Sequence, residues 1–358
     1  MKTALIMAGG TGGHIFPGLA VAHRLRERGW SVHWLGGHPP SMESQLVPPH
    51  GFDYQQVQFS GVRGKGLMTL FTLPYTLLRA CWQSLQVLRR IKPDVVLGMG
   101  GYISFPAGVM AALTGHKLVV HEQNSVAGMA NKVLAMFAQS VLTTFPNVLK
   151  KAQWIGNPLR EAFVRQARPS ERLGKRHGPL QLLVVGGSLG AQALNTVVPQ
   201  ALALMSEFKR PVVIHQSGAK QIDALRAAYE EADVQATLTP FIEDTAQAFA
   251  HADVVIARAG ASTVTELAAI GVAAIYVPFP HAVDDHQTTN AKFVVDAGGG
   301  WLIPQPELSA QGLADLLQTL TREKLVQVAE KAYAMRKTEA TEKTVSICEQ
   351  LAHVGGAA

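Results

Sequence analysis

A short strand, a glycine-rich turn and a helix open the chain, and no other feature limits the possible folds as much. Residues 3–8 are apolar enough for a buried strand, and residues 18–28 have the pattern of a helix. The turn between them reads Gly9-Gly-Thr-Gly-Gly-His14, and its glycines allow positive φ and a close backbone approach to a ligand. In parallel α/β sheets this arrangement is a usual cradle for a phosphate, although it can also be a purely structural turn.

The turn matches neither of the two familiar nucleotide-binding loops. A P-loop ends in Gly-Lys-Ser/Thr, whereas this turn ends in His14. A dinucleotide fingerprint needs a glycine where Ile15 stands and an acid after the second strand, where residues 36–38 are Gly-Gly-His. A histidine at the tip of a loop has no packing reason to be there, which favours a functional site over a structural turn.

The same arrangement begins again in the second half of the chain. Residues 180–185 predict a strand, Gly186-Gly-Ser-Leu-Gly-Ala191 a second glycine-rich loop, and residues 194–205 a helix. Between the halves, Asn157-Pro158 and the polar stretch 167–179 interrupt the pattern. The chain therefore starts a second domain of the same design.

We expect two doubly wound, Rossmann-like α/β domains that face a cleft. A chain of 358 residues is long enough for two cores. The expected domains are residues 1–160 and 161–337, with a last helix in 338–358 that joins the first domain. The remaining strands are expected at residues 32–35, Val95–Gly98, 118–121, 141–143, Val212–Gln216, Val254–Ala257 and 274–277.

Two further loops in the first half follow predicted strands. These are Gly98-Met-Gly-Gly-Tyr-Ile-Ser-Phe-Pro106 and His121-Glu-Gln-Asn-Ser125. Ligands of an open parallel sheet bind at the carboxyl ends of its strands. Together with the first turn, three polar or glycine-rich loops are therefore expected to converge on one edge and form a binding site.

The charge is divided unevenly along the chain. Residues 1–160 hold 15 Lys and Arg against 5 Asp and Glu, a balance of +10, whereas residues 161–358 hold 17 against 21, a balance of −4. This asymmetry indicates an anionic partner for the first half, either a nucleic acid or an anionic membrane. With 47% apolar and 16% charged residues the chain is globular, and Cys81 and Cys348 fit buried thiols in a reducing cytosol.

The segment 67–91 carries more apolar residues than one buried helix face needs. Arg79, Arg89 and Arg90 lie on it. One interpretation is an amphipathic helix packed wholly against the sheet. The other is a membrane-facing patch with basic neighbours. No run of about 18 apolar residues, as a membrane-spanning helix would need, occurs in the sequence.

The stretch after the strand Val254–Ala257 is the most informative part of the second half. Gly260 provides a turn, and Ser262 and Thr263 are placed to cap a helix whose free N–H groups suit a pyrophosphate. Glu266 then has two interpretations of equal weight, a capping-box acid of the first turn or a carboxylate that holds ribose hydroxyls. Further on, Asp284-Asp285 is explained by a helix start rather than by a metal.

Six motifs, in order along nearly the whole chain, resemble those of the MurG family of bacterial peripheral-membrane glycosyltransferases with GT-B architecture. They are Gly9-Gly-Thr-Gly-Gly-His14, Gly98-Met-Gly-Gly-Tyr102, His121-Glu-Gln-Asn124, Gly156-Asn-Pro-Leu-Arg160, Gly186-Gly-Ser188 and Arg258-Ala-Gly-Ala-Ser-Thr-Val-Thr-Glu266.

The resemblance implies transfer of N-acetylglucosamine from UDP-N-acetylglucosamine (UDP-GlcNAc) to a lipid-linked acceptor. The acceptor would be the C4 hydroxyl of the N-acetylmuramoyl-pentapeptide on undecaprenyl pyrophosphate, and the product a peptidoglycan precursor. It also implies an inverting reaction without metal or cofactor, and a peripheral position on an anionic membrane at the cytoplasmic face of the inner membrane. No nucleic acid partner is expected.

The resemblance further implies roles for individual residues. His14 would be the general base, because histidine is the residue type that titrates near neutral pH. Substrate contacts are implied for Thr11, Gly12, Gly13, Tyr102, Asn124, Arg160, Ser188, Ile242, Ala261, Ser262, Thr263, Val264, Thr265, Glu266 and Gln287.

Within this set, each part of the donor has its own contacts. The uracil would meet the backbone at Ile242, and Glu266 would hold the ribose. The diphosphate would lie by Ser188, Arg160 and residues 261–263. The sugar would lie by Asn124 and Gln287. The family often has a second glutamine where this chain has His286, which leaves that sugar contact open.

Two other functions compete with this one. A non-catalytic protein that binds membrane or RNA would explain the basic first half, but the sequence shows no RNA motif and no interleaved aromatic residues. Another enzyme of the same architecture, such as a sugar-nucleotide epimerase or a transferase with a soluble acceptor, is the nearer alternative.

Overall fold

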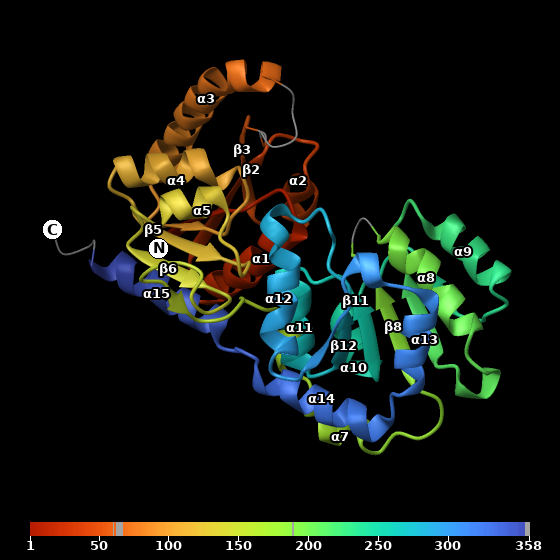
Figure 1. Cartoon of the computed structure of the whole chain (residues 1–358). Helices are drawn as coiled ribbons and strands as arrows, with labels where there is room; N and C mark the ends of the chain where they lie inside the picture. Colours follow the sequence, from red (N-terminus) through yellow and green to blue (C-terminus); the bar gives the residue numbers. More distant parts are fainter. Residues whose placement is uncertain (60, 62–66, 188–189, 355–358) are drawn as a thin grey trace. The chain divides into compact units, whose positions relative to one another are not determined.

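The computed structural model describes residues 1–59, 61, 67–187 and 190–354. It divides into two compact units, Met1–Arg160 with Lys337–Ala358, and Glu161–Arg336. Each unit is a parallel sheet between helices, so the predicted α/β class with two doubly wound sheets is confirmed (Figure 1).

The first unit is built on a seven-stranded parallel sheet with the order β3-β2-β1-β4-β5-β6-β7. In this sheet Met7 of β1 lies opposite Gly98 of β4, so the loops that follow these strands leave at the same level. The strands are β1 (Thr3–Met7), β2 (Ser31–Gly37), β3 (Asp53–Val57), β4 (Val95–Gly98), β5 (Lys117–Glu122), β6 (Ser140–Thr143) and β7 (Gln153–Trp154).

Helices cover both faces of the first sheet, and each face has its own apolar core. One core includes Ile15 and Leu25 of α1 and Val345 and Cys348 of α15. The other includes Leu88 of α3 and the small side chains of α4. The helices are α1 (Gly12–Glu27), α2 (Met42–Leu46), η1 (Pro48–His50), α3 (Leu67–Ile91), α4 (Ser104–Leu113), α5 (Met129–Leu134) and α15 (Ala340–Val354).

The C-terminal helix α15 belongs to the first unit although it follows the whole second unit in sequence. Arg28 at the end of α1 donates to Glu342 at 2.5 Å and to Glu349 at 2.6 Å. Near the start of α15, Thr341 Oγ1 donates to the carbonyl of Leu159 at 3.2 Å. These contacts and the buried Val345 and Cys348 hold α15 against the sheet.

The second unit repeats the design with six parallel strands in the order β10-β9-β8-β11-β12-β13. The strands are β8 (Gln181–Val185), β9 (Val212–Gln216), β10 (Thr237–Thr239), β11 (Val254–Ala257), β12 (Ala273–Tyr276) and β13 (Gly300–Leu302). The helices are α6 (Glu161–Val164), α7 (Pro169–Leu173), α8 (Gln192–Ala203), η2 (Glu207–Lys209), α9 (Ile222–Glu231), α10 (Thr245–His251), α11 (Ala261–Ile270), η3 (Val283–Asp285), α12 (His286–Val295), η4 (Gln305–Glu307), α13 (Ala310–Gln318) and α14 (Arg322–Ala334).

Candidate active site

The three predicted loops of the first unit meet at the carboxyl edge of its sheet. A Cβ atom added at Gly101, in the loop after β4, would lie 2.2 Å from the carbonyl oxygen of Gly9 in the loop after β1. A Cβ atom added at Gly100 would lie 2.8 Å from His14 Nδ1, and His14 Nδ1 is itself 2.8 Å from Oε1 of Gln123 in the loop after β5. The predicted convergence of the three loops is confirmed.

His14 lies in the first turn of α1 and not at a loop tip. The helix begins at Gly12, and the extended Thr11 (φ −141°, ψ 155°) accepts hydrogen bonds from the N–H groups of His14 and Ile15. The expected start at residue 18 was therefore too late, because two glycines disfavour a helix in isolation and hide its first turn in the sequence. The prediction that His14 lacks a packing partner was also wrong, since Gln123 binds it.

A chain of hydrogen bonds leads from His14 to the interior of the first unit. Gln123 Nε2 lies 3.1 Å from His121 Nδ1, and His121 Nε2 lies 2.9 Å from the carbonyl oxygen of Gly156. Both Gln123 and His121 are buried. Burial lowers the pKa of His121 to about 4, with the neighbouring His14 adding to the effect, so His121 is neutral at physiological pH.

Glu43 holds the glycine-rich turn through hydrogen bonds to the backbone. The sequence analysis did not identify Glu43 as a site residue. This fully buried carboxylate accepts from the N–H of Gly10 at 3.1 Å and from the N–H of Gly37 at 2.9 Å. A Cβ atom at Gly9 would lie 2.5 Å from Glu43 Oε1. Glu43 therefore ties the loop after β1 to the end of β2. One of its two partners, the N–H of Gly10, is 33 residues away in sequence, so no local motif could have identified it.

In the second unit, α11 begins without a side-chain cap. Its N-cap is Gly260, and Ser262 and Thr263 are the second and third helical residues, so the prediction that they cap the helix was wrong. Glycine at the N-cap has no side chain with which to cap the first N–H groups of the helix. Such a helix start suits an anion.

Glu266 is the sixth residue of α11, in its second turn. The first turn contains no acid, and a capping box would need the third residue, which is Thr263. The capping-box interpretation of Glu266 is therefore wrong, since it needs the N-cap at Thr263 and the helix starts three residues earlier, after Gly260. Glu266 is half-buried. Of its two interpretations, only the one in which the carboxylate holds ribose hydroxyls is left.

The start of α12 fixes the backbone that leads into α11. Gln287 Oε1 accepts from the N–H of Phe279 at 2.9 Å and from the N–H of Ala259 at 3.3 Å. The buried Asn290 donates to the carbonyl of Ala259 at 3.1 Å. Since the oxygen of Gln287 is occupied, only its amide N–H groups remain for a sugar. At the same helix start, Asp285 accepts from Thr288 Oγ1 at 2.7 Å.

The other predicted site residues lie in their own units as follows. Arg160 is exposed and stacks its guanidinium 5.5 Å from the ring of Phe16 on α1. Tyr102 lies beside Gly10, and burial raises its phenol pKa. Asn124 donates its backbone N–H to the buried Glu122 at 2.9 Å. Ile242 is half-buried in the loop after β10. Ser188 lies outside the described residues.

Helix α3 carries an exposed apolar stripe. Phe71, Tyr75, Leu78 and Trp82 are 84%, 69%, 70% and 59% exposed. Spacings of four, three and four residues place them on one helix face. The interpretation that this segment is wholly buried is wrong, since only the opposite face packs on the sheet. Figure 1 shows α3 projecting beyond α4 and α5. Within the described residues, no helix is long and apolar enough to cross a membrane.

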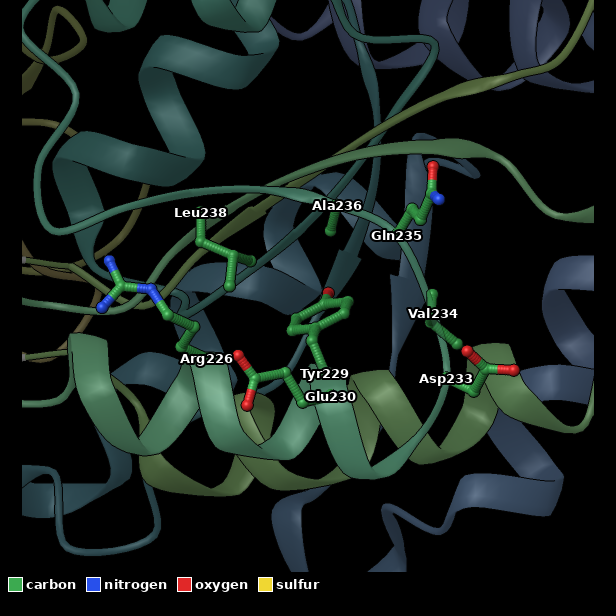
Figure 2. A pocket seen from close by; sticks show the side chains of 8 residues that line it. All are labelled: Arg226, Tyr229, Glu230, Asp233, Val234, Gln235, Ala236 and Leu238. Carbon is green, nitrogen blue, oxygen red and sulfur yellow. The ribbon is translucent and has the colours of Figure 1, made fainter.

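A hollow of about 410 Å³ lies in the second unit beside α9 and the segment leading to β10 (Figure 2). Its lining includes the charged Arg226, Glu230 and Asp233 together with Tyr229 and Leu238. None of the predicted site residues lies in it. We assign it no role in the site.

Comparisons with known proteins agree on one family. The glycosyltransferase family 28 N-terminal domain matches residues 4–143, and the family 28 C-terminal domain matches residues 181–351. A UDP-N-acetylglucosamine--N-acetylmuramyl-(pentapeptide) pyrophosphoryl-undecaprenol N-acetylglucosamine transferase of Polaromonas sp. is 66% identical, over 98% of this chain and 92% of the relative. Its namesake from Burkholderia ambifaria is 59% identical, over 98% of this chain and 96% of the relative.

Solved structures give the same answer. The crystal structure of Acinetobacter baumannii MurG has a TM-score of 0.85 and 38% identity, over 98% of this chain and all of that chain. The glycosyltransferase VinC, at 15% identity and a TM-score of 0.66, shares the fold alone. The two sheets together are the predicted GT-B architecture. The chain belongs to glycosyltransferase family 28 and, within it, to the MurG family of N-acetylglucosaminyltransferases.

Proposed function

We propose that the chain transfers N-acetylglucosamine from UDP-GlcNAc to the C4 hydroxyl of N-acetylmuramoyl-pentapeptide on undecaprenyl pyrophosphate. Membership of the MurG family supports this reaction, whose donor and lipid-linked acceptor are in the names of relatives 59–66% identical to the chain. At the site, the observation that carries the proposal is His14, held by Gln123 where three glycine-rich or polar loops meet. The product is the lipid-linked disaccharide precursor of peptidoglycan, which serves wall growth, cell shape and division.

A direct assay tests the reaction. Purified protein is mixed with labelled UDP-GlcNAc and a muramoyl-pentapeptide pyrophosphate lipid with a short prenyl chain. We expect the label to move to the lipid. Label that moves only to a soluble sugar acceptor, or that is epimerised while still bound to UDP, would support the alternative enzymes instead. No transfer to any acceptor contradicts the proposal.

In the proposed mechanism one displacement inverts the anomeric carbon. The acceptor C4 oxygen forms a bond to C1 of the donor sugar while the bond from C1 to the diphosphate oxygen breaks. The proton of the C4 hydroxyl moves to His14, and the bonding electrons leave with UDP. A positioned base of this kind accelerates a reaction by about 10²–10⁴-fold.

The second unit is proposed to hold the donor. The uncapped start of α11, with residues 261–265, offers backbone N–H groups and a positive helix end to the diphosphate. Glu266 would accept hydrogen bonds from the ribose hydroxyls, and the backbone at Ile242 would meet the uracil. Gln287 would donate its amide N–H groups to the sugar.

The remaining predicted contacts divide between the two substrates. Arg160 would neutralise the departing diphosphate, Ser188 would face the diphosphate, and Asn124 would contact the sugar. Thr11, Gly12 and Gly13 at the start of α1, together with Tyr102, would bind the acceptor.

The first unit is also proposed to dock on an anionic membrane at the cytoplasmic face. The exposed stripe Phe71–Tyr75–Leu78–Trp82 supports this, and Arg79, Arg89 and Arg90 are exposed on the same helix. The polyprenyl tail of the acceptor stays in the bilayer, so the enzyme has to reach the surface. Each basic residue near an anionic leaflet contributes about 1 kcal/mol, which salt screens.

Liposome co-sedimentation tests the docking. Binding should require anionic lipid, weaken with salt, and fall when Arg79, Arg89 and Arg90 are all changed to Gln. The matched control changes the exposed Arg165, Arg168 and Arg226 of the second unit to Gln, which removes the same charge. Equal loss in both variants, or equal binding to neutral and anionic vesicles, contradicts the docking surface.

A further inference from the structure

The hydrogen-bond chain from Gly156 to His14 has only one consistent direction. The carbonyl of Gly156 accepts only, so His121 Nε2, 2.9 Å away, carries a proton. His121 is neutral, since burial lowers its pKa to about 4. Its Nδ1 is therefore an acceptor, and the group of Gln123 that faces it at 3.1 Å is the amide NH₂.

The orientation of the Gln123 amide in turn determines the tautomer of His14. With its NH₂ turned to His121, Gln123 presents Oε1 to His14 Nδ1 at 2.8 Å. An amide oxygen accepts only, so the proton of neutral His14 stands on Nδ1 and the lone pair on Nε2. Nε2 is then the atom that can take a proton. The other tautomer would place two lone pairs against each other.

Close packing and burial hold these hydrogen-bonded side chains in place. A Cβ atom at Gly100 would lie 2.8 Å from His14 Nδ1 and 3.2 Å from Gln123 Oε1, so the φ +95° backbone of Gly100 packs directly on this hydrogen bond. Gln123 and His121 are both at most 1% exposed, and water has little access to replace either partner. A buried hydrogen-bond network whose members are all paired is rigid, and this favours a single tautomer.

We infer that Gln123 is a positioning residue that sets the tautomer of His14, and that His121 sets which way the Gln123 amide faces. The inference rests on the proposed function, in which His14 is the base. The amide is neutral, so it orients the imidazole before and after proton transfer without adding a charge. His121 does not touch the substrate and acts only through Gln123.

The tautomer can be measured in the unaltered protein. The chain is labelled with ¹⁵N-histidine, and long-range ¹H–¹⁵N spectra are recorded at a pH above the range in which histidine titrates. His14→Ala identifies the signals of His14. We expect a protonated Nδ1 and an unprotonated Nε2. An unaltered protein with the proton of His14 on Nε2 overturns the inference.

A variant tests the role in catalysis. Gln123→Met keeps the length of the side chain but removes both hydrogen bonds, and the His14 signals should shift toward the Nε2-protonated form. We expect kcat to fall about 10- to 100-fold, less than for loss of the base, because part of the population keeps the correct tautomer. KM for UDP-GlcNAc should stay within about twofold, since the base is not a ground-state contact of the donor.

Gln139→Met is the matched control. Gln139 Oε1 accepts from the N–H of Leu118 at 2.6 Å, so this variant also removes a glutamine bond to β5, at the opposite end from His121. It should leave kcat and the tautomer unchanged. If it lowers kcat as much as Gln123→Met does, the loss reflects damage to β5 and the inference is wrong.

A double-mutant cycle separates this inference from the proposed function. In a His14→Ala background, Gln123→Met should have no further effect on the residual rate, because residues that act as one unit are not additive. An additional tenfold loss there contradicts the positioning role. Normal turnover of His14→Ala alone would overturn the base itself, whereas normal turnover of Gln123→Met alone overturns only the positioning.

Discussion

The sheet of each unit starts with the same succession of strand, glycine-rich loop and helix, but the two units support these loops by different means. In the first unit a buried carboxylate, Glu43, holds the loop, and a histidine at the helix start joins a chain of buried side chains. In the described part of the second loop the support is a neutral amide, since Gln216 Nε2 donates to Gly187 at 3.1 Å and to Pro240 at 3.0 Å.

The difference agrees with the roles proposed for the two units. A base must present one particular nitrogen, which requires a fixed tautomer and therefore directional side-chain partners. An anion site needs only backbone N–H groups and a helix start, and α11 supplies these without a side-chain cap. In the proposed mechanism the same scaffold carries proton transfer in the first unit and anion binding in the second.

The largest expected effect comes from removing the base. His14→Ala should lower turnover about 10²–10⁴-fold, because the acceptor hydroxyl loses the group that takes its proton. Binding of UDP, measured by calorimetry, should stay normal if the second unit alone holds the nucleotide.

The control is His251→Ala, which removes an exposed histidine from the end of α10 in the second unit and should leave turnover unchanged. If His14→Ala retains turnover, the first loop has no role in proton transfer. If it abolishes UDP binding, the proposed division of labour between the units fails.

Sequence reasoning found the interior of both sheets but not their edges. It predicted the central strands, such as β4 (VVLG) and β11 (VVIA), because they are buried on both faces and consist of uninterrupted apolar residues. The four strands it missed, β3, β7, β10 and β13, are the four edge strands. Edge strands such as β3 (DYQQV) are partly polar, so they carry no such signal.

The candidate site was predictable in the same uneven way. His14 is the last residue of the first glycine-rich motif, and Gln123 is the third residue of the motif His121-Glu-Gln-Asn124. Their bond joins positions 109 residues apart, and Glu43 binds the N–H of Gly10 from 33 residues away. Contacts of this kind depend on which strands become neighbours, which local pattern does not encode.

The supports of the two loops should differ in strength. Glu43→Gln replaces an acceptor of two N–H groups by an amide whose NH₂ must face one of them, so it should destabilise the protein by about 3 kcal/mol. Gln216→Leu removes two neutral hydrogen bonds and should cost about 1–2 kcal/mol. Denaturant unfolding measures both losses, and equal losses or a larger loss in Gln216→Leu would show that Glu43 supports its loop no more strongly than Gln216 supports its own.

Acid should weaken the hydrogen-bond chain of the first unit. The pKa of His121 is about 4 in the folded protein, below the 6.5 of an unfolded histidine, so the unfolded chain binds more protons between these values. The contribution of the buried, neutral His121 to the free energy of unfolding is therefore fully present above pH 6.5 and is lost as the pH falls toward 4. Between pH 7 and pH 5 the loss from His121 is about 2 kcal/mol.

Unfolding measured at both pH values tests this prediction. His121→Asn should lose that part of the pH dependence. The second unit has a comparable group, because burial lowers the pKa of His215 to about 3, and His215→Asn is the matched variant there. If only His215→Asn reduces the dependence of the unfolding free energy on pH, the acid sensitivity belongs to the second unit and not to the hydrogen bonds that link His121 to His14.

The smallest expected effect concerns the one carboxylate proposed for the donor site. Glu266 lies in the second turn of α11, so capping does not account for it, and its proposed role is to accept from both ribose hydroxyls. A deoxyribose donor loses one of these bonds, which should cost the enzyme about 1 kcal/mol, the lower end of the range, because the other hydroxyl stays bound. Competition between uridine and deoxyuridine diphosphates measures this preference, and Glu266→Ala should abolish it.

The control is Glu243→Ala, which removes an exposed acid beside Ile242 and should leave the preference intact. A Glu266→Ala variant that still favours uridine diphosphate would mean that the second unit reads the nucleotide through its backbone alone.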